Sequence, residues 1–249
     1  MSTRVCLTVD VEDWYDGMAE LGQHLPRPEG ARSGLAGLAE LLDRPTVRPV
    51  VTLFVVGKYV DVLGPELEEL VGQGHEMASH GPDHGHLPED PTALLEWLRR
   101  GRAVLEDRLG RPVRGFRSPR FDVPATMGLD RYRDLLADAG FEYVSDTRVL
   151  GSASPVRELP VLARFGYPFG GGSYQRLLPA AATRSAVDSA TGPAVLYYHS
   201  YDFGATLPTT ASIRSVPVAK QLVGRGRIRT LFGQMLDRYG SEACGHAGA

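Results

Sequence analysis

The chain has 249 residues, of which 43% are hydrophobic and 23% charged, which is enough for one large α/β domain or two small ones. A formal net charge of −3 gives no electrostatic reason to expect nucleic acid or an anionic membrane surface as a partner. No run of 18 apolar residues occurs, so no integral membrane segment is predicted. The start, MSTRVCLTV, lacks the apolar core of a signal peptide, and we therefore expect a cytoplasmic protein.

Short apolar strands alternate with helical patterns along the chain. Strands are expected over residues 5–9, 50–56, 77–79, 114–116, 143–145 and 194–199. Helices are expected over residues 33–43, 61–72, 90–110, 125–139 and 228–239. In the clearest helix, Asp90 is the expected N-cap, Pro91 the first helical residue and Gly110 the stop signal. Repeated strand, helix, strand succession predicts parallel βαβ units in a barrel or an open sheet.

Two segments fall outside this alternation. PFGGGSYQRLLP, residues 168–179, predicts a glycine-rich loop that lacks the lysine of a P-loop and the spacing of a dinucleotide fingerprint. SEACGHAGA, residues 241–249, is small and polar, and we expect it to be a disordered tail. Residues 1–240 are treated as one domain. The two cysteines, Cys6 and Cys244, predict neither a disulfide framework nor a CxxC metal site.

Histidines are concentrated where one predicted strand ends. EMASHGPDHGHL, residues 76–87, holds three of the seven histidines of the chain. A tight turn between His80 and His84 could direct both imidazoles to one point, and two imidazoles with a carboxylate are a common protein ligand set for catalytic Zn²⁺. The alternative is that these are surface loop histidines. His86 is expected to lie outside such a site, because a third imidazole is not needed.

Carboxylates are concentrated at the end of the first strand. TVDVEDW, residues 8–14, brings together Asp10, Glu12 and Asp13, whose mutual repulsion is costly without a cation. Asp10 and Glu12 are two residues apart and point to the same side of an extended segment. This second strand end favours a metal site over surface histidines.

Taken together, these segments resemble the NodB-homology polysaccharide deacetylases, carbohydrate esterase family 4. The resemblance is closer still to a subgroup with a VDVED first motif that is found with exopolysaccharide gene clusters. Over roughly residues 4–235, the matching segments are LTVDVEDWY, VTLFVVGKY, GHEMASHGPDH, GFRSPRF, YPFGGGSYQRLLP and YYHSYDF. The resemblance implies a distorted (β/α) barrel of about seven parallel strands with a divalent metal in its bowl.

The resemblance also implies roles for individual residues. His80 and His84 would be metal ligands, and Asp10 the general base that activates water on the metal. His199 would be the general acid that protonates the departing amine. Arg117 would pair with Asp10 and hold its carboxylate in place. Zn²⁺ is the expected metal, and Co²⁺, Ni²⁺ or Fe²⁺ would suit the same ligand types.

The first motif departs from the adjacent aspartates of many family members. We assign Glu12 as the third metal ligand and Asp10 as the base. The alternative alignment would put the metal on Asp13 and make Glu12 the base. Near the last motif, Asp202 either orients His199 or caps a turn.

The substrate-facing surface is expected to include Arg120, Trp14 and Phe121, since aromatic rings can stack on sugars. Arg120 stands where the family usually has an aromatic or small residue. Core packing is the alternative account of each aromatic residue.

The predicted function is a metal-dependent N-deacetylase that hydrolyses the acetamide of an N-acetylated amino sugar, either a soluble one or a precursor glycoconjugate. That substrate is the expected partner, and oligomeric state is not predicted. One alternative is a carbon–nitrogen hydrolase of a non-sugar amide or cyclic imide, as in allantoinase-like relatives. Another is a non-catalytic carbohydrate-binding barrel.

Overall fold

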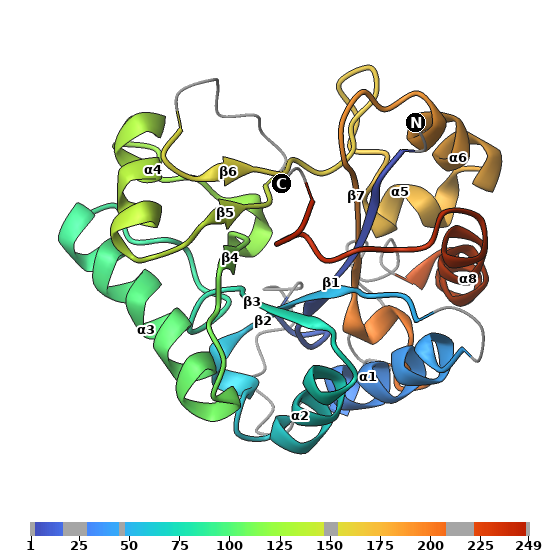
Figure 1. The fold of residues 1–249 in the computed structure, drawn as a ribbon, viewed down its shortest axis with the longest axis horizontal. Helices are drawn as coiled ribbons and strands as arrows, with labels where there is room; N and C mark the ends of the chain where they lie inside the picture. Colours follow the sequence, from blue (N-terminus) through green and yellow to red (C-terminus); the bar gives the residue numbers. More distant parts are fainter. Residues whose placement is uncertain (1–2, 17–28, 45–47, 147–153, 208–221, 248–249) are drawn as a thin grey trace.

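The computed structural model describes residues 3–16, 29–44, 48–146, 154–207 and 222–247. Seven strands form one sheet that curls inside a ring of helices (Figure 1). The strands are β1 Val5–Val11, β2 Thr52–Val55, β3 Glu76–Ser79, β4 Gly115–Phe116, β5 Tyr143–Val144, β6 Arg157–Glu158 and β7 Ala194–His199. The α-helices are α1 Glu29–Leu42, α2 Gly64–Gly72, α3 Pro91–Leu109, α4 Leu129–Asp138, α5 Gly172–Leu177, α6 Ala180–Asp188 and α8 Ile228–Tyr239.

All neighbouring strands of the sheet are parallel, in the order β6-β5-β4-β3-β2-β1-β7. The segment that follows β6 approaches the other edge strand, β7, through an isolated parallel bridge between Val161 and Val195. This architecture confirms the predicted distorted barrel of about seven parallel strands. Among the described residues, no helix has the length and apolar character needed to cross a bilayer.

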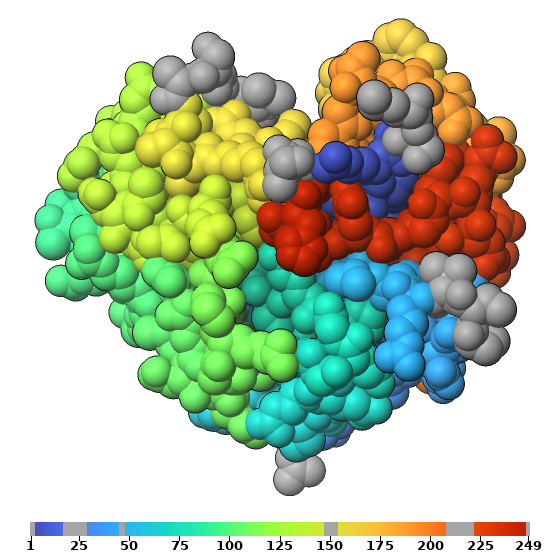
Figure 2. Space-filling view, in the orientation of Figure 1, coloured from blue at the N-terminus to red at the C-terminus, as the bar shows by residue number. Residues whose placement is uncertain are grey.

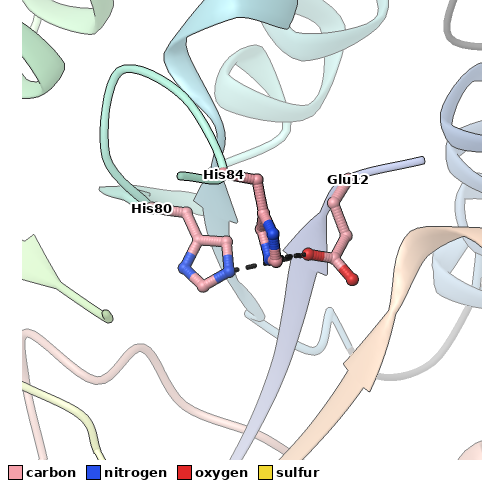
Figure 3. A group of neighbouring side chains, drawn as sticks. All are labelled: Glu12, His80 and His84. Carbon is pink, nitrogen blue, oxygen red and sulfur yellow. Dashed lines mark ion pairs between the residues drawn. The ribbon is translucent and has the colours of Figure 1, made fainter. Parts of the chain in front are cut away.

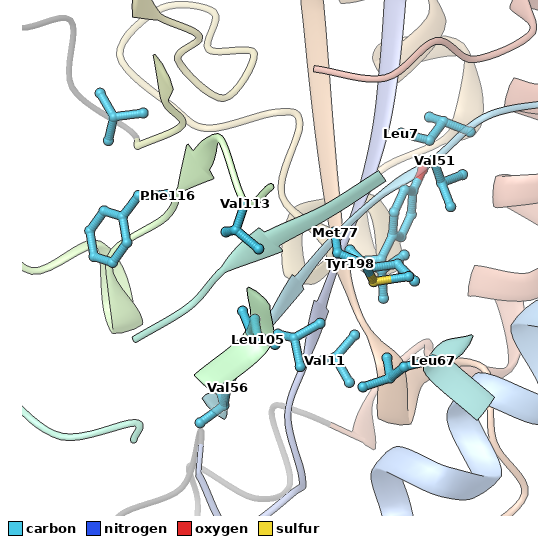
Figure 4. Packing of buried hydrophobic residues seen from close by; sticks show 14 of the residues in the cluster. Leu7, Val11, Val51, Val56, Leu67, Met77, Leu105, Val113, Phe116 and Tyr198 are labelled. Atoms are coloured by element: carbon cyan, nitrogen blue, oxygen red, sulfur yellow. The ribbon is translucent and has the colours of Figure 1, made fainter. Parts of the chain in front are cut away.

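Burial on both faces explains why the strands read as nearly continuous apolar runs. Every residue of β1 is buried: Val9 packs in the cluster between sheet and helices, while Cys6 packs in a smaller cluster with Phe54 and Tyr143. Figure 4 shows part of the larger cluster, where Leu67 of α2 approaches the strands. A parallel sheet covered on both faces needs such two-sided apolar strands.

Helix α3 begins and ends as its sequence predicts. The Asp90 side chain accepts a hydrogen bond from the Ala93 N–H at 2.8 Å and caps the helix. Gly110 ends it in the left-handed conformation, with φ of 62°. Pro91 is the first helical residue.

One strand and two α-helices lie outside the predicted elements. Strand β6 is two residues long, which is too short for an alternating pattern to identify it. Helix α6 lies in a segment for which the sequence predicts no element. Within the predicted glycine-rich loop, residues 172–177 form the short helix α5, so the loop prediction is wrong for that half of the segment.

The disorder predicted for residues 241–249 is wrong for residues 241–247. Cys244 is fully buried beside Cys6, and its N–H donates to Thr52 Oγ1 at 2.9 Å. The Ser241 hydroxyl accepts from the Leu7 N–H at 3.0 Å. In Figure 2 this red segment fills the middle of the face, between the blue β1 and the yellow-green β5 and β6. The prediction failed because this segment is stabilised by contacts with distant strands, which its small, polar composition does not reveal.

Candidate metal centre and active site

The strands deliver the predicted site residues to one edge of the barrel. Glu12 directly follows β1, His80 follows β3, Arg117 follows β4, and His199 ends β7. Because parallel strands all end at the same edge, these four side chains meet there. Asp10 lies opposite His199 in the register of β1 and β7, so the two are direct neighbours across the sheet.

Glu12, His80 and His84 form a group whose ligand atoms all lie within 4.8 Å of one another, and we call it the metal group. Glu12 Oε2 is 2.6 Å from His84 Nε2 and 3.7 Å from His80 Nε2. Figure 3 shows both imidazoles turned toward the carboxylate at the end of β1. All three residues are buried. Within the described residues, this is the one His/Cys/Asp/Glu group with metal-ligand geometry.

Hydrogen bonding prepares the metal group for a cation. His80 Nδ1–H donates to the Arg117 carbonyl at 2.9 Å, which leaves the lone pair of Nε2 free to face Glu12. Burial alone would raise the pKa of Glu12, but the adjacent imidazoles of His84 and His80 hold it well below its usual range. Burial likewise opposes charge on His84, yet the Glu12 carboxylate outweighs it and raises the His84 pKa. A buried, ionised carboxylate between two imidazoles fits a divalent cation.

The Asp13 carboxylate forms hydrogen bonds with helix α1 and is not part of the metal group. Its Oδ2 accepts hydrogen bonds from the N–H groups of Gly30 and Ala31, at 2.8 and 3.1 Å, in the first turn of α1. A carboxylate there satisfies unpaired helix donors and complements the helix dipole. Burial raises the pKa of Asp13 despite these bonds. The geometry therefore favours Glu12 over Asp13 as the carboxylate of the metal group.

Asp10 and Arg117 form a buried ion pair, with Oδ1 and Nη1 2.6 Å apart. The same Nη1 donates to Thr8 Oγ1 at 2.9 Å. The other guanidinium nitrogens donate to the carbonyl and hydroxyl of Ser145, at 2.9 and 2.8 Å. The ring of Phe54 lies 4.0 Å from the guanidinium carbon. This network fixes the arginine, and through it the Asp10 carboxylate.

His199 lies between two carboxylates. Its Nε2 is 3.7 Å from Glu12 Oε1, and its Nδ1 is 3.5 Å from Asp202 Oδ2. Asp202 also accepts from the His199 backbone N–H at 3.2 Å, so it both faces the imidazole and caps the turn. Its other oxygen pairs with the buried Arg176 of α5. Burial lowers the pKa of His199, but the Asp202 and Glu12 carboxylates outweigh it and raise the pKa.

A pocket of about 210 Å³ opens over the metal group. Its lining includes Asp10, His199, Arg120 and Phe121. Trp14 does not contribute: it is 1% exposed, and its ring stacks on the Tyr201 ring at 4.2 Å. The substrate-binding role predicted for Trp14 is wrong, because this burial leaves no ring face for a sugar. His86 is also outside the pocket, with a side chain that is 81% exposed.

A larger hollow, about 500 Å³, lies at the opposite end of the strands. Its lining includes Glu76 at the start of β3, Arg114 just before β4, and residues of the 241–247 segment. The metal group and the buried ion pairs of the proposed catalytic residues are all at the other end. Volume therefore does not identify the reactive site here, whereas the chemistry of the lining does.

Sequence reasoning missed several residues that support the site. Ser145 binds Arg117, Ser200 binds the Glu12 backbone, and Arg176 pairs with Asp202. Arg176 lies in the quoted segment YPFGGGSYQRLLP, so the motif pointed to this region without a role for the arginine. The serines had no signal, because their partners lie more than 25 residues away.

Two family models match the chain, one mainly in its first half and one in its second half. Residues 33–144 match the family described as polysaccharide deacetylase, and residues 133–246 match a domain of unknown function, DUF3473. The polysaccharide deacetylase match covers less than half of the chain. The match agrees with the predicted hydrolase acting on carbon–nitrogen amide bonds. No curated protein matches the chain.

Solved structures of similar fold include a protein from Mycobacterium smegmatis described as a polysaccharide deacetylase. It shares 19% identity, with 95% of this chain and 85% of that chain covered and a TM-score of 0.66. A family 4 acetyl xylan esterase from Clostridium thermocellum, in complex with a cobalt ion, shares 15% identity over 98% and 89%, with a TM-score of 0.52. A CE4 family pseudoenzyme from Bacillus anthracis shares 13% over 97% and 63%, with a TM-score of 0.55. At these identities the likeness shows the fold alone.

Proposed function

We propose that this chain is a divalent-metal-dependent N-deacetylase that hydrolyses the acetamide of an N-acetylated amino sugar. One observation carries the proposal: the metal group, Asp10 and His199 all border a single pocket, and the fully buried Arg117 pairs with Asp10. Amide hydrolysis needs an activated water, a base and a proton donor for nitrogen, and these residue types supply each of them. We extend the proposal to the exopolysaccharide-associated subgroup, on the VDVED first motif.

The metal group supports the cofactor part of the proposal. Two neutral imidazoles and one carboxylate are the ligand set of many catalytic zinc sites, and they leave a position for water or substrate. A bound Zn²⁺ would lower the pKa of water to about 7 and polarise the acetyl carbonyl. Co²⁺, Ni²⁺ and Fe²⁺ are compatible with the same ligands, and the Clostridium esterase of this fold binds cobalt.

Asp10 is proposed as the general base. Its carboxylate borders the pocket, and the buried guanidinium of Arg117 fixes one oxygen at 2.6 Å. The other oxygen remains to take a proton from the attacking water. Arg117 touches no substrate on this account: it positions Asp10, through its own bonds to Ser145.

His199 is proposed as the general acid for the departing amine. Asp202 and Glu12 raise its pKa, which favours the protonated form needed to donate a proton near neutral pH. The pairing of Asp202 with Arg176 keeps that carboxylate in place beside the imidazole. The stacked Tyr201 ring, 4.9 Å away, limits the ring orientations open to His199.

Released amine is the direct test. We expect metal-loaded protein to liberate amine from N-acetylhexosamine conjugates and not from cyclic ureides or imides. His80→Ala and His84→Ala should abolish turnover and strip the metal, whereas the matched control His86→Ala should do neither. Turnover of cyclic imides alone would favour the allantoinase-like alternative. A metal-loaded protein that is inactive on both classes would favour the non-catalytic barrel.

A further inference from the structure

The guanidinium of Arg120 is a cationic group at the border of the pocket that opens over the metal group. Its Nη2 donates to the His84 carbonyl at 3.2 Å, and its Nε lies 3.7 Å from Asp122 Oδ2. That carboxylate oxygen is closer to His86 Nδ1, at 2.9 Å. The Arg120 side chain is 30% exposed. The guanidinium therefore reaches solvent beside the site where the acetamide is proposed to react.

The backbone that presents Arg120 is strained. Arg120 and Phe121 both have φ of 57°, in the left-handed region that residues with a Cβ disfavour by about 1 kcal/mol or more each. Three hydrogen bonds hold this turn: Phe121 N–H to Ser118 O at 3.0 Å, Asp122 N–H to Pro119 O at 3.0 Å, and Ser118 Oγ to Asp122 O. A turn kept in a costly conformation indicates that the placement of the side chain matters.

The turn is also anchored to the barrel. The Ser118 N–H donates to Oδ1 of the buried Asp146 at 3.1 Å, and the Arg117 N–H donates to Ser79 O at 3.0 Å. Arg120 is therefore held on a fixed support. Preorganised charges cost little to use when a ligand arrives.

The other charges of the site are compensated within the protein. Asp10 pairs with Arg117, and the Glu12 carboxylate lies between the imidazoles of the metal group. Arg120 is only partly compensated, because its one carboxylate contact is the 3.7 Å approach to the Asp122 oxygen that lies closer to His86. A guanidinium has five donor N–H groups, and within the described part of the chain Arg120 makes one hydrogen bond, to His84 O. Guanidinium groups match carboxylates and phosphates in planar, bidentate geometry.

We propose that Arg120 selects N-acetylated sugars that carry an anionic substituent, a carboxylate or a phosphate, close to the reacting acetamide. This inference rests on the proposed deacetylase function. The competing account is structural: Arg120 would only clamp the loop of His84 through its carbonyl. The two accounts differ, because a clamp affects metal binding and all substrates alike, whereas a recognition group discriminates between charged and neutral ones.

The test compares Arg120→Met and Arg120→Lys with the matched control Arg114→Met. Arg114 lies at the other end of the barrel and has one carboxylate partner, Glu142, at 3.5 Å. The substrates are the methyl glycoside of N-acetylglucosamine, the same glycoside with a carboxylate at C6, and N-acetylglucosamine 1-phosphate. We expect Arg120→Met to lower the ratio of kcat/KM for an anionic over the neutral substrate by about 10- to 100-fold, the range for one charge-assisted contact. Arg120→Lys should keep part of that ratio, and Arg114→Met all of it.

Binding gives a readout that needs no turnover. Calorimetry with glucose 1-phosphate and metal-free protein should show a Kd at least 10-fold weaker for Arg120→Met than for wild type, and the metal content of reconstituted variants should stay equal. An unchanged substrate ratio, or equal losses on all substrates with loss of metal, would overturn the inference. If wild type deacetylates nothing, the deacetylase proposal fails, and the calorimetric comparison still decides whether Arg120 binds anions. Comparing the substrate that has a carboxylate at C6 with the 1-phosphate shows whether Arg120 prefers a uronate or a sugar phosphate.

Discussion

The hydroxyl of Ser200 donates a hydrogen bond to the Glu12 carbonyl at 2.7 Å and accepts one from the Glu12 N–H at 3.2 Å. This double contact joins the first and last motifs of the chain, 188 residues apart. It fixes the backbone from which the Glu12 carboxylate reaches the two histidines. The metal geometry therefore depends on the position of the short helix η4, Ser200–Asp202.

Gly34 of α1 leaves room for η4 to pack against the helix, because it has no Cβ. A Cβ at Gly34 would lie 2.0 Å from the Ser200 carbonyl oxygen, so Gly34→Ala should displace η4 and with it Glu12. We expect a loss of about 1–3 kcal/mol in the free energy of unfolding, as for other overpacked sites, and weaker metal binding. Denaturant titration and metal analysis after dialysis measure both. Gly72→Ala is the matched control, because nothing lies within 4 Å of its added Cβ; equal effects at both sites would contradict this account.

Substitutions of Glu12 and Asp13, two carboxylates of the first motif, should affect metal binding differently. Glu12→Gln should lose most of the bound metal, because it removes the charge between the two imidazoles. Asp13→Asn should keep the metal and most of its stability, because an amide oxygen can still accept from the N–H groups of Gly30 and Ala31. Metal analysis and thermal unfolding of the two variants make the comparison. Metal loss in Asp13→Asn with retention in Glu12→Gln would instead select the alternative alignment.

Asp202→Asn tests the proposed general acid through pH. Asp202 raises the pKa of His199, so its removal should lower that pKa. Activity that needs protonated His199 falls as pH rises through its pKa, and this limb should therefore move to lower pH in the variant. The kcat/KM profile of an N-acetyl substrate reports the shift, with metal content as control. A limb that stays in place would show that His199 is not the titrating acid.

Asp146 should make the protein less stable at higher pH. Burial raises its pKa from 3.8 to about 7, so between these values the folded chain binds a proton that the unfolded chain lacks. Stability from this group is then lost as pH rises through the window, by at most about 1.4 kcal/mol per unit. Asp146→Asn should raise Tm relative to wild type more at pH 8 than at pH 5, and the exposed Asp107→Asn should not. An equal difference at both pH values would contradict the assignment.

Local signals in the sequence predicted the parts of the molecule that local physics determines. Asp90 and Gly110 bound α3 because capping acts within a turn of the helix. The strand ends located Glu12, His80 and His84, since parallel strands must finish at one edge. The choice between Glu12 and Asp13 could not be made from spacing, because it depends on where α1 begins in space.

Long-range packing accounts for what could not be predicted. Trp14 looked like a sugar-stacking residue beside the first motif, and its burial against Tyr201 depends on a segment almost 190 residues away. The pairing of Arg176 with Asp202 likewise joins two motifs whose separate sequences carry no trace of the contact. Such pairs exist only once the barrel has closed.

The segment 241–247 has a consequence for how the chain is made. Its residues hydrogen-bond to Leu7 of β1 and Thr52 of β2, which are among the first parts of the barrel to leave the ribosome. This end of the barrel therefore stays uncovered until the chain has been synthesised through Cys244, 192 residues after Thr52. During that interval the apolar interior around Cys6 and Phe54 is open to water, to chaperones and to proteases. Closure of this end of the barrel therefore requires residues 241–247, which follow both strands in the chain.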